Sequence, residues 1–91
     1  MEVKASHILV KNKTLALKIY QELKNGANFA QLAKTYSECP SKSKGGDLGF
    51  FGPGVMAKEF ENATMKLAMH RISLPVKTQF GYHIIEKTGV R

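Results

Sequence analysis

The chain has 91 residues, of which 43% are hydrophobic, and this composition fits one small globular domain over residues 1–91 rather than a disordered tail. Its 14 Lys and Arg against 7 Asp and Glu give a net charge of +7. Because the lysines are scattered, we interpret this charge as that of a solvated surface. Nucleic acid is the less favoured partner. No apolar stretch reaches the ~20 residues of a membrane span, no signal-peptide core is visible, and one cysteine excludes an internal disulfide. We therefore expect a cytoplasmic monomer.

The first part of the chain predicts a central strand followed by two helices. Residues 3–10 (VKASHILV) carry apolar side chains on both faces, which is typical of a central strand. Asn12 can cap a helix that runs to about Lys24, with an apolar residue at every fourth position. Asn28 followed by Gln31 forms a capping-box pattern, which predicts the start of a second helix.

The second part predicts short strands around one more helix. We expect an irregular segment over 37–47, a strand over 48–51, a helix over about 57–67, a strand over 73–78 and a last strand over 82–87. Pro75 cannot donate to a central ladder, so the strand that contains it is expected at an edge. This order favours an α+β fold in which helices pack on a small four-stranded sheet.

Two histidines lie inside apolar strand-like runs at opposite ends of the chain. A charged imidazole would be costly there, so His7 and His83 are expected to be neutral and hydrogen-bonded. A lone histidine of this kind is most often a structural core residue. If the two strands are neighbours, however, the imidazoles meet and form a polar site in the core. Phe80, in a turn before Gly81, then resembles one wall of a pocket.

Most familiar chemistry finds no support in the sequence. The glycine-rich GGDLGFFGPG stretch lacks the spacing of a nucleotide-binding loop. A metal site would need His7, His70, His83 and Cys39 to converge, and their spacings match no zinc pattern. A nucleophilic Cys39 with His7 or His83 as base stays open, although no oxyanion hole is evident. We therefore expect no cofactor and no metal.

Several segments together resemble the parvulin family of peptidyl-prolyl cis/trans isomerases. The matching stretches, in chain order, are SHILV, GANFAQLAKTYS, CPS, GGDLGFF, GVMAKEF and PVKTQFGYHII. Each motif is weak alone, but the ordered set covers nearly the whole chain. The resemblance implies a four-stranded antiparallel sheet surrounded by helices. It also implies a folding helper that rotates X–Pro amides in proline-containing peptides and unfolded proteins, with no cofactor.

The resemblance also assigns site residues. Those that it places in the catalytic network are His7, Cys39, Thr78 and His83. Those that it places around the substrate proline, with the last one at the rim, are Leu48, Met56, Phe60 and Phe80. The two histidines would be paired on neighbouring central strands, and the cysteine would occupy a position where the family carries Cys or Asp.

The chain departs from the family in two places. Only Lys11–Lys13 precede the first helix, where parvulins directed to phosphoproteins carry a longer basic loop, so recognition of phospho-Ser/Thr before proline is not expected. The segment 69–72 replaces the usual Gly-Glu turn, and His70 is expected at the surface. The alternative function is a non-catalytic module that binds unfolded chains as a chaperone, or nucleic acid through its basic surface.

Overall fold

A computed structural model describes all of residues 1–91 as an α+β fold with a four-stranded antiparallel sheet. The elements, in chain order, are β1 (Val3–Val10), α1 (Lys13–Lys24), α2 (Phe29–Tyr36), the 3-10 helix η1 (Pro40–Lys44), β2 (Asp47–Phe51), α3 (Lys58–Lys66), β3 (Val76–Thr78) and β4 (Gly81–Val90). The strand order is β2-β1-β4-β3. The two strands that carry the buried histidines are therefore the central pair, as the fold prediction requires. None of the helices combines the length and the apolar character needed to cross a membrane.

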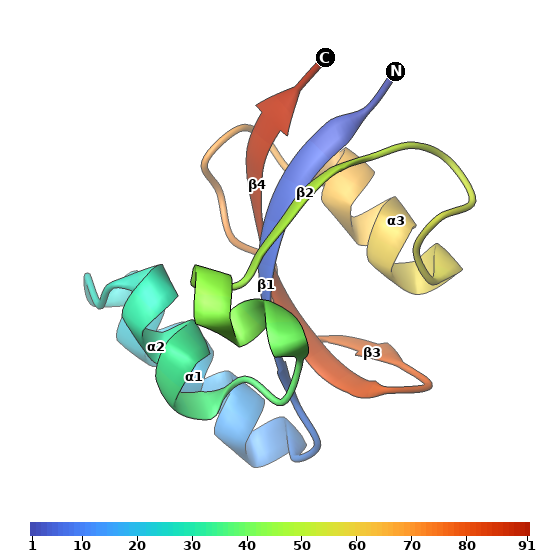
Figure 1. The fold of residues 1–91 in the computed structure, drawn as a ribbon. Helices are drawn as coiled ribbons and strands as arrows, with labels where there is room; N and C mark the ends of the chain where they lie inside the picture. The colour runs from blue at the N-terminus through green and yellow to red at the C-terminus, as the bar shows by residue number, and fades with distance from the viewer.

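The helices cover both faces of the sheet. Figure 1 shows α1 and α2 on one side of the central strands and α3 on the other. The core cluster on the α1/α2 side consists of Ile8, Val10, Ala16, Ile19, Ala33 and Ile84. The core cluster on the α3 side consists of Val3, Ala5, Phe51, Phe60 and Ile85. Apolar residues on both faces of β1 and β4 are thus used to build two half-cores.

The first two helices begin where the sequence predicts. The side chain of Asn12 accepts a hydrogen bond from the backbone N–H of Leu15 (3.1 Å), and that of Asn28 accepts one from Gln31 (2.9 Å). Each bond satisfies an N–H that has no partner within its helix. These caps confirm the predicted starts of α1 and α2.

Three element boundaries differ from the sequence prediction. The segment expected to be irregular contains the 3-10 helix η1, and Pro40 is the first residue of this helix. The edge strand β3 begins at Val76 rather than residue 73, because Ser73 and Pro75 precede the regular ladder. Ser73 instead donates its N–H to the carbonyl of Ile85 (2.8 Å). The last strand β4 extends beyond the predicted Lys87, pairing with the start of β1.

Thr64 is a polar residue that is fully buried in α3. Its side chain is fully buried among the apolar residues of that helix face. The hydroxyl donates to the carbonyl of Phe60, one turn earlier in the same helix (2.8 Å). Because this bond satisfies the hydroxyl, burial of the threonine carries little desolvation penalty.

Gly46 joins β2 to the histidine strand. Its carbonyl accepts the N–H of His7 (2.9 Å), and its φ of +90° lies in the left-handed region. A Cβ at this position would lie 2.5 Å from the His7 carbonyl oxygen. Glycine is therefore required here both by conformation and by the close approach of two backbones.

We predict that Gly46→Ala lowers the free energy of unfolding by at least about 3 kcal/mol. Gly54→Ala is the matched control, because Gly54 also has a positive φ (+83°) but no atom within 4 Å of the new Cβ. Its cost should be limited to conformational strain of about 1 kcal/mol. Urea unfolding of both variants measures the difference. Equal losses would show that the contact with β1 adds nothing.

Candidate active site

The two strand histidines form a hydrogen-bonded pair in the core. His7 on β1 and His83 on β4 lie on the same face of the sheet, on diagonal positions of adjacent strands, since His7 pairs with Ile85 and Leu9 with His83. Their Nδ1 atoms are 2.9 Å apart. The rings are nearly parallel, with centroids 5.1 Å apart, and each side chain is 5% exposed. The structure thus brings together the two imidazoles that the sequence singled out.

Thr78 extends the pair into a chain of hydrogen bonds. Its hydroxyl oxygen lies 2.7 Å from His83 Nε2 and accepts the N–H of Phe80 (3.2 Å). In one proton arrangement, His7 donates to His83 and His83 donates to Thr78. In the other, Thr78 donates to His83 and His83 donates to His7. Each imidazole carries one proton in both arrangements, so the network is satisfied with neutral rings.

The environment of the pair favours the neutral form. The pKa of His7 is lowered from 6.5 to about 4, mainly by burial and to a smaller extent by the neighbouring His83. Burial also lowers the pKa of His83 to about 4. Removing water penalises the imidazolium, and no carboxylate in the network compensates. Both rings are therefore uncharged at neutral pH. The Nε2 atom of His7 is buried without any hydrogen-bond partner.

A largely apolar cavity of about 320 Å³ opens above the histidine pair. Seven of the residues assigned from the resemblance line it: His7, Cys39, Leu48, Met56, Phe60, Phe80 and His83. Thr78 does not line it but lies directly behind His83 through their hydrogen bond. Phe60 is buried and meets both imidazoles edge-on, with centroid distances of 5.5 Å to His7 and 5.2 Å to His83. Phe80, which is 52% exposed, lies at the opening.

Four further residues line the cavity and were not assigned from the sequence: Leu9, Glu38, Pro40 and Ala57. Leu9 lies two positions after His7 on β1, so both side chains point to the same face of the sheet. The alternation of the strand could therefore have predicted that Leu9 lies beside the histidine pair. The other three are sequence neighbours of Cys39 or Met56. Glu38 brings an exposed carboxylate to an otherwise apolar wall.

The loop that carries Phe80 is held from two sides. Lys11 donates a hydrogen bond from Nζ to the Phe80 carbonyl (3.0 Å), while Thr78 accepts the Phe80 N–H. Gly81 then turns the chain at a φ of +138°, where a Cβ would lie 2.6 Å from the Val10 carbonyl oxygen. No local pattern in the sequence indicated the contact with Lys11, because 69 residues separate the two positions.

The arrangement provides neither a thiol–imidazole pair nor a metal cluster. Cys39 is a half-buried free thiol. Its backbone N–H donates to the Ser37 hydroxyl (3.4 Å) and its carbonyl accepts the N–H of Lys42 (3.0 Å), so its hydrogen bonds involve the backbone and not the thiol. The close partners of the imidazoles are each other and Thr78. His70 lies outside the cavity and is exposed, as expected. No group of three or more His, Cys, Asp or Glu side chains is placed to hold a metal ion.

The fold and the histidine cavity define a parvulin-type isomerase domain. Residues 1–91 match the family model of the PPIC-type PPIase domain. The chain therefore belongs to the PPIC-type family of peptidyl-prolyl isomerase domains.

Similar proteins support the same family. The chain is 56% identical over 91 residues to "Foldase protein PrsA 1" of Bacillus cereus, covering 99% of this chain and 32% of the relative. A crystal structure of the peptidylprolyl isomerase PrsA from Bacillus anthracis matches with a TM-score of 0.98 and 50% identity, over 99% of this chain and 42% of that chain. The solution structure of NmPin, the parvuline of Nitrosopumilus maritimus, matches with a TM-score of 0.86 and 46% identity, over 97% and 96% of the two chains. The chain thus spans about one third of the PrsA relative and nearly all of the single parvulin.

The lowered pKa values of the pair predict an acid-sensitive fold. The unfolded chain protonates His7 and His83 near the ordinary pKa of 6.5, whereas the folded chain does so only near 4. Their stabilising contribution is therefore complete above pH 6.5 and is lost as the pH falls towards 4. We expect the free energy of unfolding to drop over this range by about 3 kcal/mol for each of the two histidines.

Two single substitutions isolate the contribution of the pair. His83→Asn should reduce the pH dependence between 6.5 and 4 by roughly half, because burial still lowers the pKa of His7; urea unfolding at each pH measures it. His70→Asn removes an exposed histidine whose charge lowers the pKa of Glu86, so it should change the slope much less than His83→Asn does. Parallel profiles for His83→Asn and the unmodified chain would contradict the assignment of the proton-linked stability to the pair.

Proposed function

We propose that this domain catalyses cis/trans rotation of X–Pro amides in exposed or unfolded chain segments, without a covalent intermediate, as a folding helper. The observation that carries the proposal is a neutral histidine pair at the floor of an apolar cavity of about 320 Å³. A cavity of this size accommodates a pyrrolidine ring together with the groups next to it. The Bacillus relatives named as foldase proteins support a role in the folding of client chains.

Rotation of an X–Pro amide requires no bond to be broken. The barrier of ~20 kcal/mol reflects the partial double bond between carbonyl carbon and nitrogen. At the twisted transition state the nitrogen lone pair no longer conjugates with the carbonyl, so the amide is less dipolar than in the planar ground state. A dry cavity therefore favours the transition state over the ground state. A thousandfold acceleration needs only about 4 kcal/mol of such differential stabilisation.

The apolar wall has two roles in this mechanism. Leu48, Met56 and Phe60 would hold the proline ring, which removes water from the amide and fixes the ring while the carbonyl side rotates. Phe80 would close the opening above the bound segment. Because Lys11 and Thr78 hold the Phe80 backbone, this wall is already ordered before substrate binds.

The histidine pair would act through hydrogen bonds rather than as an acid or a base. Both imidazoles are neutral, and Thr78 fixes the orientation of His83. His7 lines the cavity, and its buried Nε2 has no hydrogen-bond partner within the chain. Twisting of the X–Pro amide frees the lone pair of its nitrogen. A hydrogen bond donated to that nitrogen would form only in the transition state, and its effect would add to that of desolvation.

Trimming the wall should weaken substrate binding. Met56→Ala removes most of a half-buried side chain that lines the cavity, and we expect the KM for a short proline peptide to rise roughly tenfold at similar kcat, from about 1.5 kcal/mol of lost apolar contact. Met65→Ala is the matched control, because Met65 is on α3 but outside this cavity. Exchange NMR of the peptide measures both constants. An unchanged KM in Met56→Ala would show that the proline ring does not bind against Met56.

Cys39 tests the non-covalent character of the reaction. No hydrogen bond joins its thiol to an imidazole, so we expect Cys39→Asp and Cys39→Ser to retain activity within about tenfold. A covalent mechanism instead predicts complete loss in both variants while the fold is kept. The measurement is cis/trans exchange in a proline peptide, with dispersion of the amide resonances as the check on folding.

The same assay separates the isomerase from a purely binding function. An isomerase accelerates exchange in a short proline peptide and shortens the slow refolding phase of a proline-limited protein. A chaperone that only binds chains, or a nucleic-acid module, does neither. A peptide panel that varies the residue before proline measures the preference at that position. Glu38 lines the cavity, whereas Lys42 and Lys44 are exposed and lie outside it. A monomeric state and a cytoplasmic location stay predictions from the sequence.

A further inference from the structure

A second cleft of about 380 Å³ lies on the other face of the sheet from the histidine pair. It is bounded by the end of α1, the start of α2 and the segment 70–72 that pairs irregularly with β4. Glu86 comes from β4 itself, and its side chain points to the opposite face from Ile85. The cleft and the histidine cavity share no residue. A ligand in the cleft would therefore leave the proposed catalytic cavity free.

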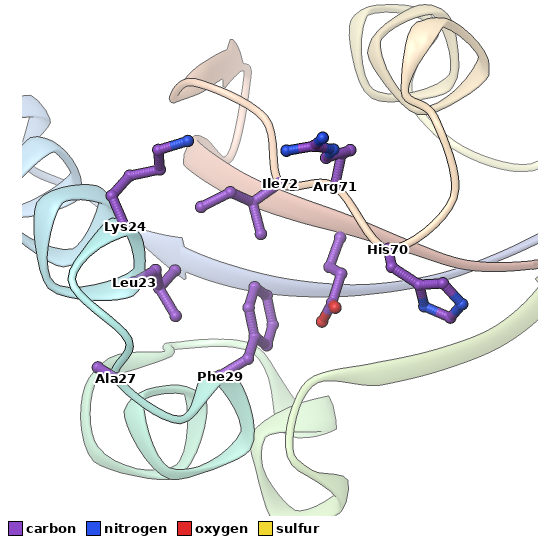
Figure 2. Close-up of a pocket in the computed structure, with 8 residues that line it drawn as sticks. Leu23, Lys24, Ala27, Phe29, His70, Arg71 and Ile72 are labelled. Carbon is purple, nitrogen blue, oxygen red and sulfur yellow. The ribbon is translucent and has the colours of Figure 1, made fainter.

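Half of the cleft wall is apolar and reachable from solvent. Leu23 and Phe29 are only partly buried, although they pack against the core on this side of the sheet. Ile72 faces them from the segment after α3, as Figure 2 shows. Three large apolar side chains thus form a surface on which one apolar side chain of a ligand can be buried.

The rim of the cleft is cationic. Lys24 at the end of α1 and Arg71 are both exposed, and neither forms an ion pair within the chain, whose ion pairs are Lys4–Asp47 and Glu2–Arg91. Figure 2 shows the ends of the Lys24 and Arg71 side chains pointing toward one another above Ile72. Two unpaired cations that converge from separate elements provide a site for one carboxylate.

We propose that this cleft binds an acidic, apolar segment of an unfolded client chain, with a carboxylate between Lys24 and Arg71 and an apolar side chain against Leu23, Phe29 and Ile72. The proposal rests on the proposed function, because the client is the same chain whose prolines enter the histidine cavity. Binding on one face while the other face remains open would keep a client at high effective concentration between successive rotations.

The charges of the cleft select this occupant over two others. A second copy of the chain would bring a net charge of +7 to a cationic rim, which opposes association. Nucleic acid binds along extended basic tracks, whereas here two cations flank an apolar floor that offers nothing to phosphates. Glu86 is the one acidic group in the cleft, so it should weaken an acidic ligand. Removing the charge of Glu86 should therefore strengthen binding, whereas reversing the charges of Lys24 and Arg71 should weaken it.

The first experiment is an NMR titration of the whole domain with a proline-free peptide of alternating Leu and Glu. We expect amide shifts in residues 23–29, 70–72 and 86, with none around His7 and His83. The pair Lys24→Glu and Arg71→Glu should weaken binding at least tenfold, and Glu86→Gln should strengthen it severalfold. Lys18→Glu with Lys66→Glu makes the same charge change at exposed sites away from the cleft and should leave the affinity within about twofold after screening.

Several outcomes would overturn the proposal. Equal binding of a Leu/Lys peptide would reduce the cleft to a nonselective apolar surface. Shifts confined to the histidine cavity, or an unchanged affinity in the Lys24→Glu/Arg71→Glu variant, would place the ligand elsewhere. Shifts at the cleft on adding single-stranded DNA but not on adding the acidic peptide would assign the surface to nucleic acid.

A second measurement keeps this proposal separate from the isomerase itself. Lys24→Glu/Arg71→Glu should leave kcat/KM for a short neutral proline peptide unchanged, because the substituted residues do not line the histidine cavity. The same variant should lower kcat/KM at least fivefold for a long client with an acidic, apolar segment distant from its proline. If the unmodified domain binds the acidic peptide at the cleft but does not accelerate proline exchange, the proposed function fails and the cleft assignment stands. An equal kcat/KM for the long client overturns the link between the two sites.

Discussion

The site depends on one hydrogen bond between two buried, uncharged imidazoles. His7 and His83 lie 76 positions apart in the chain, and only the pairing of β1 with β4 brings their Nδ1 atoms to 2.9 Å. That contact requires one ring to donate and the other to accept, so it is lost if both rings are charged. The burial that lowers both pKa values to about 4 is therefore a condition for the pair to exist, and the surrounding structure maintains it.

The same low polarity connects the fold to the chemistry. Phe60 excludes water from the edges of both imidazoles and also forms part of the cavity wall. An environment that disfavours an imidazolium equally disfavours the dipolar planar amide relative to its twisted form. One physical property, the exclusion of water from the α3 face of the sheet, thus keeps the histidines neutral and favours rotation of a bound amide.

The sequence was most informative where a signal is local. The apolar residues on both faces of 3–10 identified β1 as a central strand, and the asparagine caps identified the starts of α1 and α2, because each pattern depends on residues close together in the chain. The site residues came mainly from the ordered family motifs, and the structure gathers them around one cavity while their individual roles remain proposals. The contact of Lys11 with Phe80 and the cleft between α1 and β4 could not be predicted, since each depends on the packing of distant segments. The 3-10 turn at Pro40 was missed because proline and serine are equally common in irregular loops.

Strand β4 explains how one small domain can hold two sites of opposite character. Successive side chains of a strand point to opposite faces, so His83 and Glu86, three positions apart, lie on different sides of the sheet. The side with His83 keeps the histidine pair dry and uncharged, and the carboxylate of Glu38 that lines the same cavity is exposed. The face with Glu86 carries an exposed cationic rim, whose attraction for a carboxylate would disrupt the neutral pair if it acted at the same place. Because the packed central strands separate the two faces, a basic surface that attracts acidic chains can coexist with a neutral histidine pair in the cavity for their prolines.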